Sequence, residues 1–353
     1  MAHEIENNMI AYRGERPWHG LGFQVDENAT GAEMLEIAGL NWRVQRRALA
    51  MRNANSEGLI TEQLAGYKAI VRSDTNFVFG VPTKRYEVVQ NEQIIDLFRE
   101  YCEAGHAKME TVGALRNGAV VWALAKLNGG TAATLKGNDK INGYILFSTS
   151  HDGTLSTVGK ATSVRVVCGN TMNAALRGGV DFKVKHSTKW TDARANEAKE
   201  KLGMASKQIQ EFHSVAEKLS NINIDQQGRI EYISRLMDGK CLIDQVVENS
   251  TAVTSTNMLD AAIQSTIHRN ANPEDCLNRV GKAILEAMID SPGSDLESAR
   301  GTLWGAVNGV SYYTDHLAGR TQDSRVSNAW FGQNAELKQS AMNTAIQMAG
   351  ITI

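Results

Sequence analysis

The chain has 353 residues, of which 42% are hydrophobic and 22% are charged, and its formal net charge is −2. These values are typical of a globular protein and exclude wholesale disorder and a globally basic surface, so a surface that binds polyanions must be local. No stretch approaches the ~18 apolar residues of a membrane span, no signal peptide is visible, and the four cysteines form no C-x-x-C pair. We therefore expect a cytoplasmic protein with no membrane partner and no disulfide framework.

The first half of the chain predicts a mixed α/β region. Spaced apolar residues predict a helix over 31–40, and alternation predicts a strand over 41–52. Two further strands are expected over 66–74 and 77–89. An amphipathic helix is expected over 91–105, capped by Asn91 and ended by Gly105.

The middle of the chain predicts more strands. A hairpin over 106–127 turns at Asn117 and Gly118, and residues 129–140 read as a loop. A strand over 142–150 is followed by a turn at His151 to Thr154, since Asp-Gly favours turns. A strand over 163–168 then leads into a helix over 170–179.

The second half of the chain has mainly helical patterns. Helices are expected in five ranges, with a turn at 290–295; the ranges are 192–219, 227–237, 255–269, 274–289 and 299–319. The fold class is therefore α+β: an antiparallel or mixed sheet with packed helices, similar to a β-β-β-α core, followed by a mostly helical half. We place the domains at 1–186 and 187–353, although the two halves could share one core.

Histidine and cysteine chemistry is the first candidate function. The eight histidines stand alone without metal-ligand spacing, so we expect no metal and no other cofactor. An enzyme remains the alternative, with a site built from His19, His151, Asp152, Arg165 and Cys168. In that hypothesis His151 is the acid/base and Arg165 holds an anionic substrate. More often, however, a turn histidine and a cysteine in an apolar strand are structural.

Residues 168–173, CGNTMN, join the predicted strand to the predicted helix. A helix N-terminus there could hold an anion through its backbone N–H groups, or the same residues could simply cap the helix. Both readings stay open.

Local charge carries the most information. Between Thr157 and Lys189, six basic residues stand against Asp181 alone; they are Lys160, Arg165, Arg177, Lys183, Lys185 and Lys189. A second cluster on the early strand contains Arg43, Arg46, Arg47 and Arg52. Such stripes suit a nucleic-acid backbone, with base stacking on Trp18 or Trp42. A solvated face whose cations pair with acidic neighbours is the other reading.

Three ordered motifs give the chain a family resemblance. They are AYRGERPWHGLG (11–22), SHDG (150–153) followed by VRVVCGNTMNAAL (164–176), and ARGTLWGAVNGVSYYTDH (299–316) with NAWFG (328–332). The chain resembles a family of phage and plasmid proteins catalogued as domain of unknown function nine-three-two. This resemblance implies a phage or plasmid origin rather than an activity.

A second resemblance is architectural. The order of helix, hairpin, strands and helix between 91 and 179 is similar to the core of the Rad-type single-strand annealing proteins. That resemblance implies an oligomeric ring with single-stranded DNA in a basic groove, and it is an analogy of order and charge.

Together these observations predict a cytoplasmic, phage- or plasmid-encoded protein that binds or anneals single-stranded nucleic acid, DNA rather than RNA, in recombination or replication. It is expected to form a homo-oligomer and not to be an enzyme. Eight residues are expected to contact the nucleic acid: Lys160, Arg165, Arg177, Lys183, Lys185, Arg43, Arg46 and Arg47. The alternatives are an enzyme with catalytic His19, His151, Asp152 and Cys168, and a structural or host-interaction protein.

Overall fold

The computed structural model describes residues 9–14, 22–55, 58–103, 106–165, 170–173, 182–238, 240, 263, 265, 273–319, 328–330 and 332–352. The chain divides into two compact units. Unit 1 consists of residues 1–129, 144–161 and 180–206, and unit 2 of residues 130–143, 162–179 and 207–353. The division predicted near residue 187 stays a prediction, whereas the α+β class is confirmed.

The sheet of unit 1 is mainly antiparallel. Its strands lie side by side in the order β10 (Thr157–Arg165), β9 (Asp139–Ser150), β7 (Val120–Leu127), β6 (Ala107–Leu115), β1 (Ile10–Tyr12) and β2 (Phe23–Gln24), and β12 (Phe182–Val184) also pairs with β10. Only the short β1–β2 pair is parallel among the described strand pairs. These strands are rich in apolar residues, which is typical of buried strands, and the side chains of Trp122 and Phe147 are fully buried.

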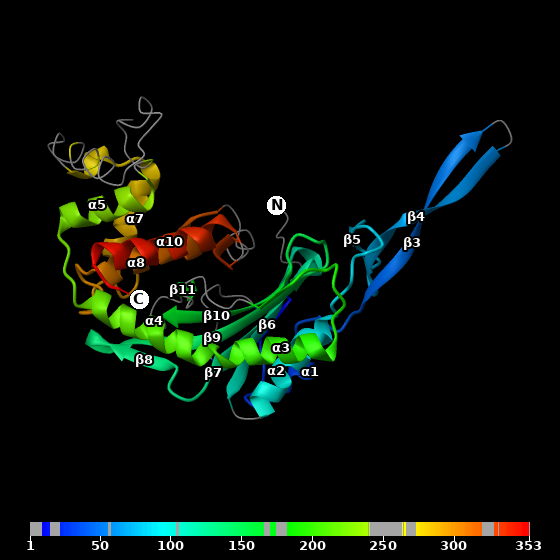
Figure 1. The fold of residues 1–353 in the computed structure, drawn as a ribbon, viewed down its shortest axis with the longest axis horizontal. Coiled ribbons are helices and arrows are strands. Elements are labelled where there is room, and N and C mark those ends of the chain that lie inside the picture. Colours follow the sequence, from blue (N-terminus) through cyan, green and yellow to red (C-terminus); the bar gives the residue numbers. More distant parts are fainter. Residues whose placement is uncertain are drawn as a thin grey trace. The chain divides into compact units, whose positions relative to one another are not determined.

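Three helices belong to unit 1: α1 (Gly31–Ile37), α2 (Asn91–Glu103) and α3 (Asp192–Gly203). Helix α1 begins with a capping box, in which the Thr30 hydroxyl accepts a hydrogen bond from the Glu33 backbone and the Glu33 carboxylate accepts one from the Thr30 backbone. Helix α2 packs against β6 and β7 (Figure 1). Its apolar face, with Ile94 and Ile95, is buried.

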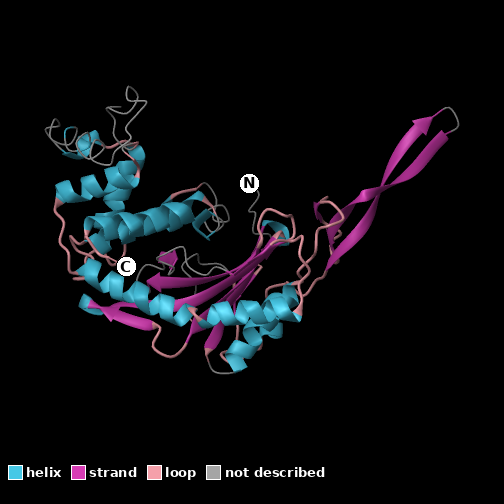
Figure 2. Ribbon diagram, in the orientation of Figure 1, coloured by secondary structure: helices cyan, strands magenta, loops and turns pink. Residues whose placement is uncertain are grey.

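A separate three-stranded sheet in unit 1 contains β3 (Val44–Asn55), β4 (Gly58–Arg72) and β5 (Val78–Gly80). Strands β3 and β4 form a long ribbon that continues past the end of β5 (Figure 2). At the inner end of this ribbon Val44, Ile70 and Val71 are buried. A β-bulge between Ala48 and Ala50 separates this inner end from the outer part.

Unit 2 is mostly helical. Its helices are α4 (Ala205–Ser220), which begins in the last residues of unit 1, α5 (Gln226–Leu236), α7 (Arg279–Asp290), α8 (Leu303–Tyr312) and α10 (Gln333–Met348), with a 3-10 turn at Pro273–Cys276 and a π-helical turn at Tyr313–Leu317. Its strands β8 (Ala132–Leu135) and β11 (Asn170–Asn173) pair with parts of β9 and β10. The side chains of Phe212, Tyr232 and Trp304 are fully buried in its core.

Several predicted elements are wrong in detail. Residues 170–173, expected to begin a helix, form strand β11, because β10 offers them an open edge and Arg165 pairs with Asn170. The expected loop at 129–140 contains β8. The strand expected over 77–89 is reduced to Val78–Gly80, since Pro82 soon follows and has no backbone N–H. The expected helix at 255–269 lies almost wholly outside the described residues, as do residues 174–179.

Candidate nucleic-acid interface

Three of the predicted lysines lie on one face of the β10–β12 pair. Val158 of β10 is directly opposite Lys183 of β12, so these two side chains share a face. Lys160 follows Val158 by two residues and Lys185 follows Lys183 by two, which places both on the same face when the extended backbone continues. We call Lys160, Lys183 and Lys185 the lysine face.

The alternation of β12 explains why its lysine faces outward. Phe182 and Val184 are buried, whereas Lys183 between them is exposed. Phe182 stacks with Phe147 at 6.2 Å between ring centroids, and Trp190 meets both rings edge-on. This apolar packing fixes the strand and leaves the side chain of Lys183 on its opposite face.

Two lysines of the lysine face carry positive charge without a counter-charge beside them. The side chains of Lys183 and Lys185 are exposed and make no hydrogen bond or ion pair with other described residues. Lys160 is half-buried and already interacts with another group. A cation of this kind can approach a phosphate at little desolvation cost, because nothing must first be displaced.

The arginines at the base of the β3–β4 ribbon are exposed, and two of them are paired. Arg43 contacts the Glu92 carboxylate at 2.7 Å, and Arg46 lies 3.5 Å from Glu87. Arg47 donates to the neutral side-chain oxygen of Gln45 instead. Surface pairs of this kind are worth about 0–1 kcal/mol, so a phosphate could replace the glutamates.

The other predicted contact residues are less informative. Arg165 lies in β10, but its side chain is outside the described part of the structure, and Arg177 is outside it altogether. Trp18, His19 and Cys168 also lie outside the described residues altogether. Trp42 is buried at 5% exposure, so the expectation that it stacks on bases is wrong for this structure.

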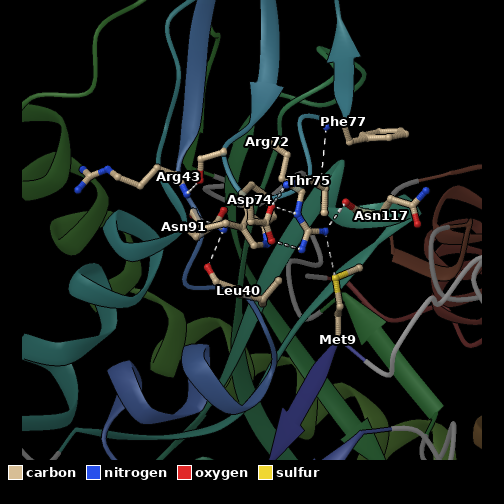
Figure 3. Close-up of polar contacts among 11 residues, drawn as sticks. Met9, Leu40, Arg43, Arg72, Asp74, Thr75, Phe77, Asn91 and Asn117 are labelled. Atoms are coloured by element: carbon tan, nitrogen blue, oxygen red, sulfur yellow. Dashed lines mark hydrogen bonds and ion pairs between the residues drawn. The ribbon is translucent and has the colours of Figure 1, made fainter.

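Trp42 belongs instead to a polar and aromatic cluster that anchors the ribbon to the rest of unit 1. The Arg72 guanidinium lies over its ring at 4.6 Å and donates to the Asn117 carbonyl (Figure 3). Arg72 also binds the Asp74 carboxylate at 2.8 Å, and this hydrogen bond holds the pKa of Asp74 below its usual value. The long hairpin is thus held at its inner end by charge-assisted hydrogen bonds.

His151 lies in the same cluster and is almost fully buried. Its Nε2 atom is 2.9 Å from the Asn91 side-chain oxygen, and its ring packs against Trp42 and Phe79. Burial lowers the pKa of His151 to about 3, with a further contribution from nearby His186. Asn91, expected to cap α2, uses its amide to bind His151 and the carbonyls of Leu40 and Trp42.

Asp152 completes the turn that the sequence predicts between β9 and β10. Its carboxylate accepts hydrogen bonds from the backbone and hydroxyl of Thr154 and pairs with Arg116 at 3.4 Å. His151 therefore faces the core while Asp152 serves the turn. Neither is presented to a substrate, and this does not favour the enzyme hypothesis.

A cavity of about 460 Å³ in unit 1 was not anticipated from the sequence. Its lining includes Arg13, Glu92, Arg99, Cys102 and Met109. Burial raises the pKa of Cys102, so its thiol is protonated and weakly nucleophilic at neutral pH. Both acidic and basic side chains line the cavity, which does not favour a phosphate chain as its ligand. The cavity forms where α1 and α2 pack over β6. Hydrophobic periodicity predicts each helix but not how the helices pack, so it does not predict the cavity.

Among the described residues, no group of three or more His, Cys, Asp or Glu side chains is arranged to hold a metal ion. Within those same ranges, no helix has the length and apolar content needed to cross a membrane.

A family model, described as "Domain of unknown function (DUF932)", matches residues 78–339. The chain belongs to this family. No curated protein and no solved structure matches the sequence. The match covers the lysine face, His151 and the helices of unit 2 as far as the first half of α10, but it begins after the β3–β4 ribbon.

Proposed function

We propose that this protein binds single-stranded nucleic acid, DNA rather than RNA, and brings strands together in recombination or replication. The lysine face is the observation that supports this best: Lys183 in β12 and Lys185 directly after this strand are exposed cations next to the buried side chains of Phe182 and Val184. Arg43, Arg46 and Arg47 extend the contact along the backbone. Binding is electrostatic and independent of sequence.

The proposal extends to source and assembly. The family resemblance supports an origin in a phage or plasmid and action in the cytoplasm of a bacterial host. We also propose that several copies act together, because pairing two strands requires more than one binding surface. No cofactor or metal takes part in this function.

The test is fluorescence anisotropy with a labelled single-stranded oligonucleotide. We expect Lys183→Glu/Lys185→Glu to weaken binding at least about tenfold and to lower the slope of log K against log salt by about 1.4, since each single-strand phosphate contact contributes about 0.7. Lysines on an edge strand also have a second role, because their charge prevents the sheets of two molecules from associating. Glutamate keeps a charge at the edge while reversing the attraction for phosphate, so the variant separates these two roles.

The matched control is Lys207→Glu/Lys218→Glu, which changes the net charge equally at exposed positions of α4. It should bind like the wild type. Equal losses in both variants would point to net charge alone and contradict a site at the lysine face, and a wild type that does not bind even at low salt would remove the proposal.

A further inference from the structure

We call the outer part of the β3–β4 ribbon, residues 48–55 and 58–67, the arm; where its side chains are described they are exposed on both faces, except for the half-buried Leu49 and Leu64. Across its register, Arg52 lies opposite Thr61 on one face and Met51 opposite Glu62 on the other, and all four side chains are exposed. In Figure 1 the two blue strands run past β5 with no other described element beside them. Its six residue pairs, from Ala50–Gln63 to Asn55–Gly58, span about 20 Å along the strands.

A ribbon of this kind is not stable by itself in water. Two strands without a buried face are marginal, and independent stability requires a third strand or a surface to pack against. The buried residues Val44, Ile70 and Val71 lie at its base and fix its register there. The arm itself therefore lacks a packing partner within the described part of the chain.

Both long edges of the arm are open over its six residue pairs from Ala50–Gln63 to Asn55–Gly58. Strand β3 is the edge of its sheet, β4 pairs with β5 through Ile70 and Val71, and residues 82–84 pair with the β4 edge only as far out as Gly66. Exposed edges are commonly protected by lysine or proline. Residues 48–67 contain neither, and they include the apolar side chains Leu49, Met51 and Leu64. The arm has the features of a strand that pairs with another chain.

The charges of the two edges differ. All the charged residues of β3 are arginines (Arg46, Arg47 and Arg52), whereas Glu62 is the one charged residue of β4 before Lys68. Placing β3 beside a second β3 would bring arginines together. Placing β3 beside β4 of another molecule brings opposite charges together and joins two open edges.

We propose that the arm binds a second copy of this chain, with the β3 edge of one copy paired with the β4 edge of the next. This inference rests on the association of copies in the proposed function but not on nucleic-acid binding. A head-to-tail contact leaves one free edge on each side of a pair, so it continues into a ring or filament and does not stop at a dimer.

The experiment is multi-angle light scattering of the full chain and of two variants. In the first, Met51 to Glu62 are replaced by Asn-Gly, which closes the shortened hairpin at the Ala50–Gln63 pair. The second, Ala50→Lys/Thr61→Lys, keeps the arm but adds edge charges at exposed positions. The control Gln210→Lys/Ser214→Lys adds the same charge on exposed positions of α4.

We expect the wild type and the control to form assemblies of more than two 38.6 kDa chains, and both arm variants to be monomers at the same concentration, with unchanged circular dichroism. A monomeric wild type, or arm variants that assemble like the wild type, would overturn the inference. A discrete wild-type dimer would overturn the head-to-tail pairing.

Anisotropy on the same samples separates this inference from the proposed function. Arm variants that are monomeric while still binding an oligonucleotide support the inference. Arm variants that stay assembled but lose the oligonucleotide would show that the arm contacts nucleic acid instead. If no sample binds nucleic acid and the arm variants still dissociate, the proposed function fails and the inference stands.

Discussion

At the scale of single residues, His151, which looked catalytic in the sequence, serves packing. The imidazole of His151 and the amide of Asn91 are both buried, and the His151 Nε2 atom lies 2.9 Å from the Asn91 side-chain oxygen, whereas the buried Nδ1 atom of His151 has no hydrogen-bond partner among the described residues. A buried polar group is tolerated when it is hydrogen-bonded, and an unpaired one costs about 1–3 kcal/mol. This pair therefore joins the start of α2 to the end of β9, and we expect its role to appear in stability, not in turnover.

The pH dependence of stability tests that role. The pKa of His151 falls from 6.5 to about 3 on folding because burial disfavours the charged ring. The unfolded chain then binds more protons below pH 6.5, so the free energy of unfolding falls as the pH drops from 6.5 toward 3. We expect His151 to contribute about 1.4 kcal/mol of loss per pH unit in that range.

Urea unfolding of the wild type and of His151→Gln between neutral pH and about pH 5 measures this contribution. The variant should be less stable at neutral pH but should have a shallower pH dependence. Burial also lowers the pKa values of His186 and of His213, the latter to about 4, so both proteins retain some acid sensitivity. Identical slopes for the two proteins would contradict the assignment to His151.

At the scale of elements, a buried ion pair joins α10 to the π-helical turn after α8. The Lys338 ammonium lies 2.6 Å from the Asp315 carboxylate, and both side chains are almost fully buried. Removing one partner of such a pair leaves a buried charge and costs about 3–5 kcal/mol, whereas replacing both with apolar residues can be nearly neutral.

We therefore expect Lys338→Met to lower the free energy of unfolding by about 3–5 kcal/mol, and Lys338→Met/Asp315→Leu to recover most of that loss. Lys207→Met, which removes one partner of the exposed Lys207–Glu211 pair, should change it by less than about 1 kcal/mol. Denaturant unfolding checks all three. A double variant no more stable than the single one would mean that Asp315 is held mainly by other groups.

Periodicity and turn chemistry were enough to place most elements. Helix α2, the β6–β7 hairpin with its Asn117-Gly118 turn, and the turn after β9 depend on local sequence and are confirmed. Strand β11 could not be predicted in this way, because its hydrogen bonds depend on the open edge of β10. The lysine face could be predicted only in part. Alternation puts Lys183 and Lys185 on one side, but the register between β10 and β12 is needed to add Lys160.

At the scale of the whole molecule, the formal net charge of −2 hides an uneven distribution. Residues 43–85 contain eight Lys or Arg against three Asp or Glu, a formal charge of +5. The rest of the chain is therefore acidic overall, although the lysine face lies within it. Long-range attraction to a polyanion is weak in such a molecule, and binding must come from short-range contacts at the basic surfaces.

This distribution predicts a strong effect of salt on oligonucleotide binding. About five phosphate contacts, from Lys183 and Lys185 of the lysine face and from the three ribbon arginines, give a slope of log K against log salt near −3.5, since each contributes about −0.7. Between about 50 and 200 mM salt the affinity should then fall about a hundredfold. Anisotropy titrations across that range measure the slope. A slope near zero would mean that stacking or hydrogen bonding, and not cations, holds the strand. A slope much steeper than −3.5 would require basic residues beyond these two surfaces.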